Sequence, residues 1–305
     1  MRRYPQLRKS VRIGNILIDN RLAVAIDASG TADANGIVNN ALIQQRMEQA
    51  ECGAGLFITE RLLVQSCCYE PPDDKRPQLK INSDDCLAGI QRYVSAIRAK
   101  GARVVLRLGM SGPKETNSAQ TQRLLPENDS DADYRFLLLA ACFRAAAVRA
   151  WKAGADGVEL DATTLDREYW LDDSIGLIRE IRDAAPVRAV VIRIGLDPFL
   201  RTNDGYDDLM DALDALIESG PPDAFHIAAE TPAASVAVLS RWTAAIRSAA
   251  ALPVIASIGI HALDDAEGLI TAQAADICAT DGSLPKRAFV RRPRSSVYYY
   301  CRGAR

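Results

Sequence analysis

Several charged side chains stand at or just beyond the ends of short apolar runs in this 305-residue chain. They are Asp27, Glu60, Arg107, Glu159, Asp161, Arg193 and Asp281. Carboxylates that crowd together in a partly dry site can serve as general acid or base, because crowding and burial raise the pKa of at least one of them. Arginines beside them can hold an anionic or enolate-like substrate. The same residues can instead form an ion-pair network without a catalytic role, and the sequence leaves both interpretations open.

Short apolar runs alternate with longer amphipathic segments along most of the chain. Eight runs are predicted as strands: 22–26, 55–59, 102–108, 156–160, 189–194, 224–228, 253–258 and 275–279. Seven segments with helical periodicity lie between or after them: 37–52, 84–100, 132–153, 172–184, 207–219, 234–250 and 262–273. Eight strands alternating with helices predict an α/β fold, a closed (βα)8 TIM barrel, with a doubly wound sheet as the alternative.

The segment 11–21 carries a Gly-Asn turn between two extended runs. This pattern predicts a β-hairpin that plugs the N-terminal end of the barrel. We therefore expect a single domain organised as a hairpin plug (1–21), the barrel (22–285) and a basic C-terminal tail (286–305).

A barrel of this type places its chemistry at the C-terminal ends of the strands and in the loops that follow. Because alternate residues of a strand share a face, Glu159 must point to the same side as Asp161, and Arg107 to the same side as Val105. The charged residues are therefore expected at the barrel mouth. His226, inside a predicted strand, is expected to be a core residue.

Seven stretches, in order, resemble one known family. They are IGNILIDNRLAVA (13–25), GAGLFITE (53–60), AKGARVVLRLG (99–109), AWKAGADGVEL (150–160), VVIRIGLD (190–197), PVIASIGI (253–260) and AADICATDGSL (274–284). Together they resemble the NADH:flavin oxidoreductase, or old yellow enzyme, family of FMN-binding barrels, particularly its dienoyl-CoA-reductase-like members. The resemblance implies the same barrel fold and a flavin at its mouth.

The positions that the resemblance assigns to flavin and substrate have diverged strongly. Ile26 and Asp27 stand where the family has Pro and Met, and Arg107 stands where it has a Gln that binds the flavin ring. The pair that grips the substrate carbonyl corresponds to Asp161 and Thr164. An ionised carboxylate only accepts hydrogen bonds, so Asp161 cannot polarise a carbonyl. The catalytic candidates are Asp161, Arg107, Asp27, Glu159 and Thr164.

The resemblance also names residues that would bind FMN. Arg193 matches the arginine that supports the flavin ring, and Gly259 matches a glycine of the phosphate site, while Gly282 stands at the position of that site's arginine. Asp281 lies where the family's phosphate site carries its glycine, and the arginine of that site is missing, so a phosphate would meet repulsion in place of attraction. A lysine or arginine of the tail could compensate.

Charge and composition limit the kinds of partner that the sequence predicts. The tail from 286 to 305 contains seven basic and no acidic residues, although the whole chain has a net charge of −2. We expect this tail to dock back on the chain or to join two copies in a homo-oligomer. The sequence shows no basic face interleaved with aromatic residues, so nucleic-acid binding is not expected. It also shows no apolar run long enough to predict a membrane span. Without a signal-like segment, and with seven cysteines that form no C-x-x-C pair, a cytoplasmic protein without a metal site is expected.

Three functions follow from these patterns. The sequence favours an enzyme that works without flavin or other cofactor and catalyses a redox-neutral step, such as cyclisation, isomerisation or elimination, on a small conjugated or carbonyl-containing metabolite. The alternative is a divergent FMN-dependent ene-reductase or NAD(P)H:flavin oxidoreductase. A second alternative is a non-catalytic binding or scaffold protein.

Overall fold

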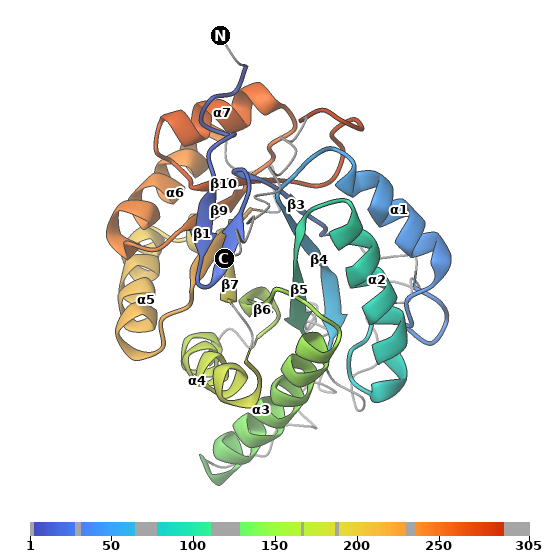
Figure 1. The fold of residues 1–305 in the computed structure, drawn as a ribbon. Coiled ribbons are helices and arrows are strands. Elements are labelled where there is room, and N and C mark those ends of the chain that lie inside the picture. The colour runs from blue at the N-terminus through green and yellow to red at the C-terminus, as the bar shows by residue number, and fades with distance from the viewer. Residues whose placement is uncertain are drawn as a thin grey trace, which may run out of the picture.

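Eight short strands, built mainly from apolar residues, pair in parallel and close into a barrel (Figure 1). The computed structural model describes residues 3–27, 32–64, 78–110, 129–165, 168–186, 189–229 and 236–289. The barrel strands are β3 (Leu22–Ala25), β4 (Leu56–Leu63), β5 (Arg103–Gly109), β6 (Gly157–Asp161), β7 (Val190–Gly195), β8 (Ala224–Ala228), β9 (Val254–Ser257) and β10 (Ile277–Thr280). Because β10 pairs with β3, the sheet has no free edge. The predicted (βα)8 barrel is confirmed, and the open doubly wound sheet is excluded.

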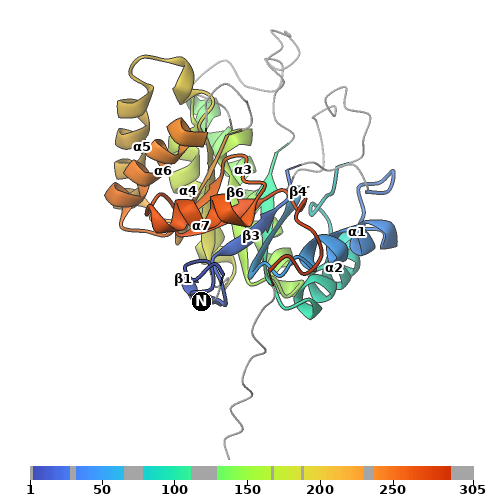
Figure 2. The same ribbon diagram turned by 90° about the horizontal axis from the view of Figure 1, so that it is seen from above.

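Helices cover the outside of the barrel and run back between successive strands (Figure 2). They are α1 (Asn40–Ala50), α2 (Leu87–Ala99), α3 (Asp129–Lys152), α4 (Trp170–Ala184), α5 (Gly205–Ser219), α6 (Val236–Ala250) and α7 (Leu263–Thr271). The helix α2 shows why these segments fold so: Ile90, Tyr93, Val94 and Ile97 recur every three or four residues and are buried against the sheet. Within the described ranges, no helix has the length and apolar character needed to cross a bilayer.

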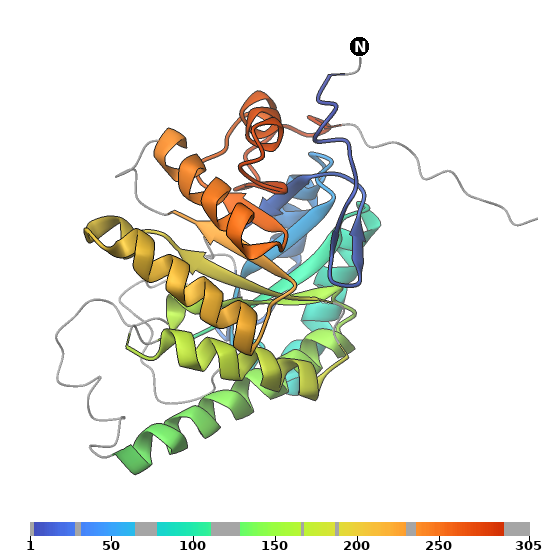
Figure 3. The same ribbon diagram turned by 90° about the vertical axis from the view of Figure 1, so that its left-hand side faces the viewer.

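A hairpin closes the N-terminal end of the barrel, as predicted. It consists of β1 (Val11–Ile13) and β2 (Ile16–Ile18), joined at Gly14, whose positive φ of 49° suits a tight turn. The isoleucines of the hairpin pack with the apolar residues that point into the lower barrel, such as Leu56 and Val105. Figure 1 looks at this hairpin end, and Figure 3 shows the hairpin at the right of the barrel seen from the side.

The first residues of the predicted basic tail lie along the end of α1. The amide of Arg287 donates to the carbonyl of Glu51 at 2.8 Å, and that of Phe289 donates to the carbonyl of Cys52 at 2.8 Å. Lys286 lies 3.6 Å from a carboxylate oxygen of Glu51. Residues 290–305 are outside the described part of the chain, so docking of the rest of the tail and its role in an oligomer stay predictions, as do the domain boundaries.

Candidate active site at the barrel mouth

A layer of charged side chains fills the barrel interior above the apolar layer. Its members are Asp27, Arg61, Arg107, Glu159, Asp161, Arg193 and His226. The predicted strand faces are confirmed here, because Arg107 lies on the same inward side of β5 as Val105, which packs in the barrel interior. Arg107, Asp161 and Arg193 stand at or near the C-terminal ends of β5, β6 and β7, where barrel enzymes carry out chemistry. Glu159 and His226 lie at the middle of β6 and β8.

Arg107 lies at the centre of this layer. Its Nε donates to Oε1 of Glu159 at 2.6 Å, and its Nη1 donates to Oδ1 of Asp27 at 2.7 Å and to the carbonyl of Ile26 at 3.0 Å. The side chains of Arg107 and Glu159 are buried. Burial alone would lower the pKa of Arg107, but the charges of Glu159 and Asp27 raise it, so this guanidinium stays charged.

Glu159 joins Arg107 to the neighbouring histidine. Its second oxygen, Oε2, lies 2.6 Å from Nδ1 of His226, which is fully buried on β8. A histidine nitrogen this close to a carboxylate carries the proton and donates it. The expected core position of His226 is confirmed, and its partner places it inside the charged layer.

Asp27 covers two arginines from the open side. Its Oδ1 accepts hydrogen bonds from Arg107 at 2.7 Å and from Arg193 at 2.9 Å. The Asp27 side chain is 45% exposed, whereas those of Arg107 and Arg193 are 2% and 1% exposed. Asp27 is therefore the part of this network that a small molecule can reach.

Asp161 is fully buried and held from several sides. Its Oδ2 accepts from Nε of Arg61 at 2.9 Å, and its Oδ1 accepts from the hydroxyl of Thr163 at 2.6 Å. Arg193 lies 3.7 Å from Oδ1. Thr164 donates its hydroxyl to the backbone carbonyl of Asp161 at 2.8 Å, which shapes the turn after β6. Both candidates lie at the mouth, but Asp161 has no exposed oxygen.

The expected upward shift of a carboxyl pKa is wrong for this layer. Burial alone would raise the pKa of Asp27, Glu159 and Asp161, but nearby positive charges outweigh it and lower all three. The charges are mainly Arg193 and Arg107 for Asp27, His226 and Arg107 for Glu159, and Arg61 and Arg193 for Asp161. Each carboxyl is therefore ionised at neutral pH and is a poor general acid.

Glu60 is not at the mouth, contrary to the prediction. It is buried between β4 and the helices, where Oε1 accepts from Nη2 of Arg46 at 3.1 Å and Oε2 accepts from the hydroxyl of Tyr93 at 2.7 Å. The pairing of β4 with β5 shifts between Ile58 and Arg61, as at a β-bulge. An extra residue reverses the faces beyond it, so Glu60 points to the helices and Arg61 to the interior.

Sequence reasoning therefore missed Arg61. A strict alternation from Ile58 predicts Glu60 inside and Arg61 outside, and only the adjacency of two charged residues at a strand end hinted at another arrangement. Arg61 lies beside Gly109 of β5: a Cβ atom at position 109 would be 3.0 Å from Cδ of Arg61. The missing side chain lets Arg61 cross β5 and reach Asp161.

The predicted phosphate residues differ in the space around them. At Gly259, with a φ of 76°, a Cβ atom would meet no described residue within 4 Å, whereas at Gly282 it would lie 2.7 Å from Nε2 of Gln49. Asp281 is exposed and its Oδ1 accepts from the amide of Ser283 at 2.9 Å. Gly259 therefore offers open backbone, while Gly282 is covered by a side chain of α1.

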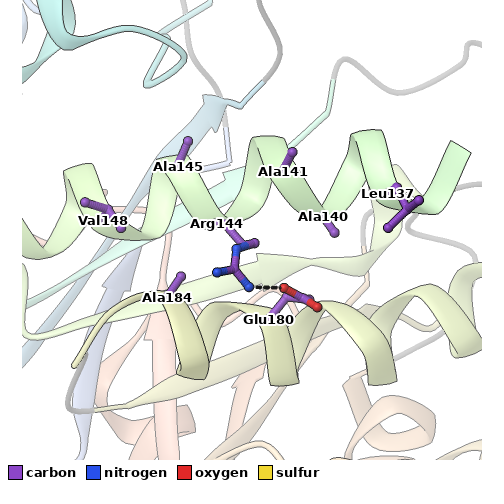
Figure 4. A pocket seen from close by; sticks show the side chains of 8 residues that line it. All are labelled: Leu137, Ala140, Ala141, Arg144, Ala145, Val148, Glu180 and Ala184. Atoms are coloured by element: carbon purple, nitrogen blue, oxygen red, sulfur yellow. Dashed lines mark hydrogen bonds and ion pairs between the residues drawn. The ribbon is translucent and has the colours of Figure 1, made fainter. Parts of the chain in front are cut away.

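A surface hollow of about 560 Å³ lies elsewhere, between α3 and α4 (Figure 4). Alanines and Leu137 line it, and Arg144 pairs with Glu180 across it. This hollow lies on the outer wall, away from the charged layer. Among the described residues, no three His, Cys, Asp or Glu side chains are grouped as a metal site.

Comparison with known proteins gives curated relatives for about half of this chain. A segment is 30% identical over 173 residues to an NADH oxidase of Thermoanaerobacter brockii, covering 52% of this chain and 26% of that protein. A metal reductase of Desulforamulus reducens is 27% identical over 163 residues, covering 50% of this chain and 24% of that protein. The chain thus matches about a quarter of the length of these curated relatives. No protein-family model matches the chain.

Solved structures agree on the fold. A 2-naphthoyl-CoA reductase complex superposes with a TM-score of 0.76 at 17% identity, over 93% of this chain and 52% of the other. The old yellow enzyme homologue from Zymomonas mobilis gives 0.66 at 16% identity, over 90% and 88%. The resemblance to the old yellow enzyme family is confirmed. The relatives are oxidoreductases, which supports the flavin alternative better than the favoured redox-neutral function.

Proposed function

We propose that this chain is an oxidoreductase of the old yellow enzyme type, acting on a small molecule with FMN held at the barrel mouth. The observation that carries the proposal is the Arg107–Asp27–Arg193 arrangement, in which an exposed carboxylate lies between two buried guanidinium groups. The oxidoreductase relatives support it further.

The donors and acceptors of this arrangement suit the polar edge of a flavin ring. That edge presents an oxygen, an N–H and a second oxygen in a row, so it needs a donor, an acceptor and a donor. Arg193 and Arg107 supply donors, and Nη2 of Arg107 has no hydrogen-bond partner among the described residues. Asp27 supplies the acceptor, because its Oδ2 takes no hydrogen bond from any described residue.

The phosphate of FMN would lie near Gly259, where backbone space is open. Asp281 turns its Oδ1 to the amide of Ser283, which reduces its repulsion of a nearby anion. When bound, FMN supplies hydride transfer. The protein's own part is to hold positive charge beside the ring through Arg107 and Arg193, since Asp161, ionised and buried, cannot donate a proton to a substrate oxygen.

The test is the colour of the purified protein. The proposal predicts absorbance of a bound flavin, release of free FMN on denaturation, and rebinding in a titration followed by quenching of flavin fluorescence. Arg193→Met should weaken rebinding, whereas Arg144→Met, on the outer wall, should leave it unchanged. A colourless protein that takes up no FMN would refute the proposal.

A second candidate is the flavin-independent, redox-neutral enzyme. It is favoured by one observation: Asp27 already binds both arginines, so that its carboxylate offsets their charge without a ligand. In that case the protein is colourless yet converts a small conjugated or carbonyl-containing compound. Finding stoichiometric flavin in the purified protein would exclude this candidate.

A further inference from the structure

Of the three guanidinium groups in the charged layer, that of Arg61 alone is partly exposed to solvent, and a hydrogen bond to Asp161 also holds it in place. Its side chain is 29% exposed, whereas those of Arg107 and Arg193 are 2% and 1% exposed. Its Nε donates to Oδ2 of Asp161 at 2.9 Å. Its two Nη groups form no hydrogen bond or ion pair with the described residues, so they are left to bind something else.

The surroundings hold this side chain in one direction. Three features set its direction. The shift in β4 turns Arg61 inward, and Gly109 leaves room for it across β5. Asp161 on β6 then accepts its hydrogen bond. Asp161 is completely buried and also accepts from Thr163 at 2.6 Å, which fixes the carboxylate. Because the buried, ionised Asp161 binds Arg61 only through Nε, the outer face of the guanidinium is directed away from Asp161.

We propose that Arg61 is the substrate-binding donor of the mouth and that it holds a carboxylate or enolate oxygen of the substrate, with Asp161 as its positioning residue. Two Nη groups in one plane match two oxygens of a carboxylate, or one enolate oxygen. Asp161 thus acts through Arg61 and does not touch the substrate. The inference rests on the proposed function in that it names its substrate class, but it requires no bound flavin.

The experiment measures binding with two matched probes, trans-cinnamate and the neutral trans-cinnamamide, by calorimetry on the purified full chain. The wild type should bind cinnamate at least tenfold more tightly than cinnamamide. Arg61→Met should abolish this preference, and Arg61→Lys should restore part of it. Equal affinity of the wild type for both probes would overturn the proposal, whether or not the protein is yellow.

Arg103 provides a matched control at the other end of the barrel. It is 24% exposed and pairs at 3.4 Å with the buried Asp156, much as Arg61 pairs with Asp161. Arg103→Met should therefore leave the preference for cinnamate unchanged. If it lowers the preference as much as Arg61→Met does, general charge and not the mouth binds the probe, and the proposal is wrong.

Asp161→Asn separates positioning from simple electrostatics. Removal of a negative charge from the mouth would by itself strengthen binding of an anion. If Asp161 positions Arg61, however, Asp161→Asn should weaken cinnamate binding severalfold and leave cinnamamide binding unchanged. Stronger cinnamate binding in this variant would contradict the positioning role.

Discussion

The guanidinium of Arg107 and the carboxylate of Glu159 face each other at 2.6 Å on neighbouring strands, with side chains only 2% and 0% exposed. The strands set this pair directly opposite, since Arg107 of β5 pairs with Glu159 of β6 in the sheet register. Removal of one member of such a pair leaves the other charge buried without compensation.

Glu159→Ala should therefore destabilise the fold by about 3–5 kcal/mol in urea unfolding. Glu180→Ala is the matched control, because Glu180 pairs with Arg144 at the surface, where a pair contributes about 0–1 kcal/mol. Equal losses in the two variants would show that the pair in the barrel has no special energetic role.

Acid should weaken the fold in a defined range of pH. Asp27, Glu159 and Asp161 have pKa values lowered from their ordinary 3.8, 4.5 and 3.8, so the unfolded chain takes up protons before the folded chain does. Their stabilisation is complete above about pH 5 and is lost as the pH falls below these ordinary values. Urea midpoints measured between about pH 7 and about pH 3 should show this fall, and Asp161→Asn should make it shallower. An identical pH profile in the variant would mean that Asp161 titrates alike in both states.

The hydroxyl of Tyr93 should matter for stability and not for binding at the mouth. Tyr93→Phe leaves Oε2 of Glu60 buried without its donor at 2.7 Å, a loss of about 1.5–3 kcal/mol. The affinity for cinnamate or FMN should not change, because Glu60 faces α1 and α2. An altered ligand affinity would place Glu60 back at the mouth.

The hairpin plug can be tested within a single strand. Ile16 is 2% exposed and packs into the barrel, whereas the adjacent Leu17 is 44% exposed. Ile16→Ala should destabilise the fold by about 2–5 kcal/mol, and Leu17→Ala by less than about 0.5 kcal/mol, in urea unfolding. A similar effect of both substitutions would show that the hairpin does not close the barrel.

The barrel could be predicted from the sequence because each strand is a short apolar run with a helix behind it. The inward direction of Arg107 followed from its two-residue spacing to Val105. The position of Val105 in the barrel interior confirms this direction. The place of Glu60 could not be predicted in this way, since the shift between Ile58 and Arg61 depends on pairing with β5 and leaves no mark on the apolar pattern.

The direction of the carboxyl pKa shifts could not be predicted either. The sequence shows that several acids end neighbouring strands, but not that each one faces a guanidinium. Asp27 lies 80 residues before Arg107 and 166 before Arg193, and only closure of the barrel brings the three together. Whether acids repel one another or are neutralised depends on these long-range contacts.

The irregular pairing of β4 also bears on how this protein can change. The two consecutive charged residues lie in different parts of the fold: Glu60 lies under the helices and Arg61 lies in the mouth. Deletion of Thr59, the single residue between Ile58 and Glu60, would remove the extra residue, restore regular alternation and keep the acid under the helices and the arginine in the mouth. Loss of the shift at unchanged chain length would instead send Glu60 into the mouth and turn Arg61 out, and would so reverse the sign of the charge offered to a ligand without replacement of any amino acid.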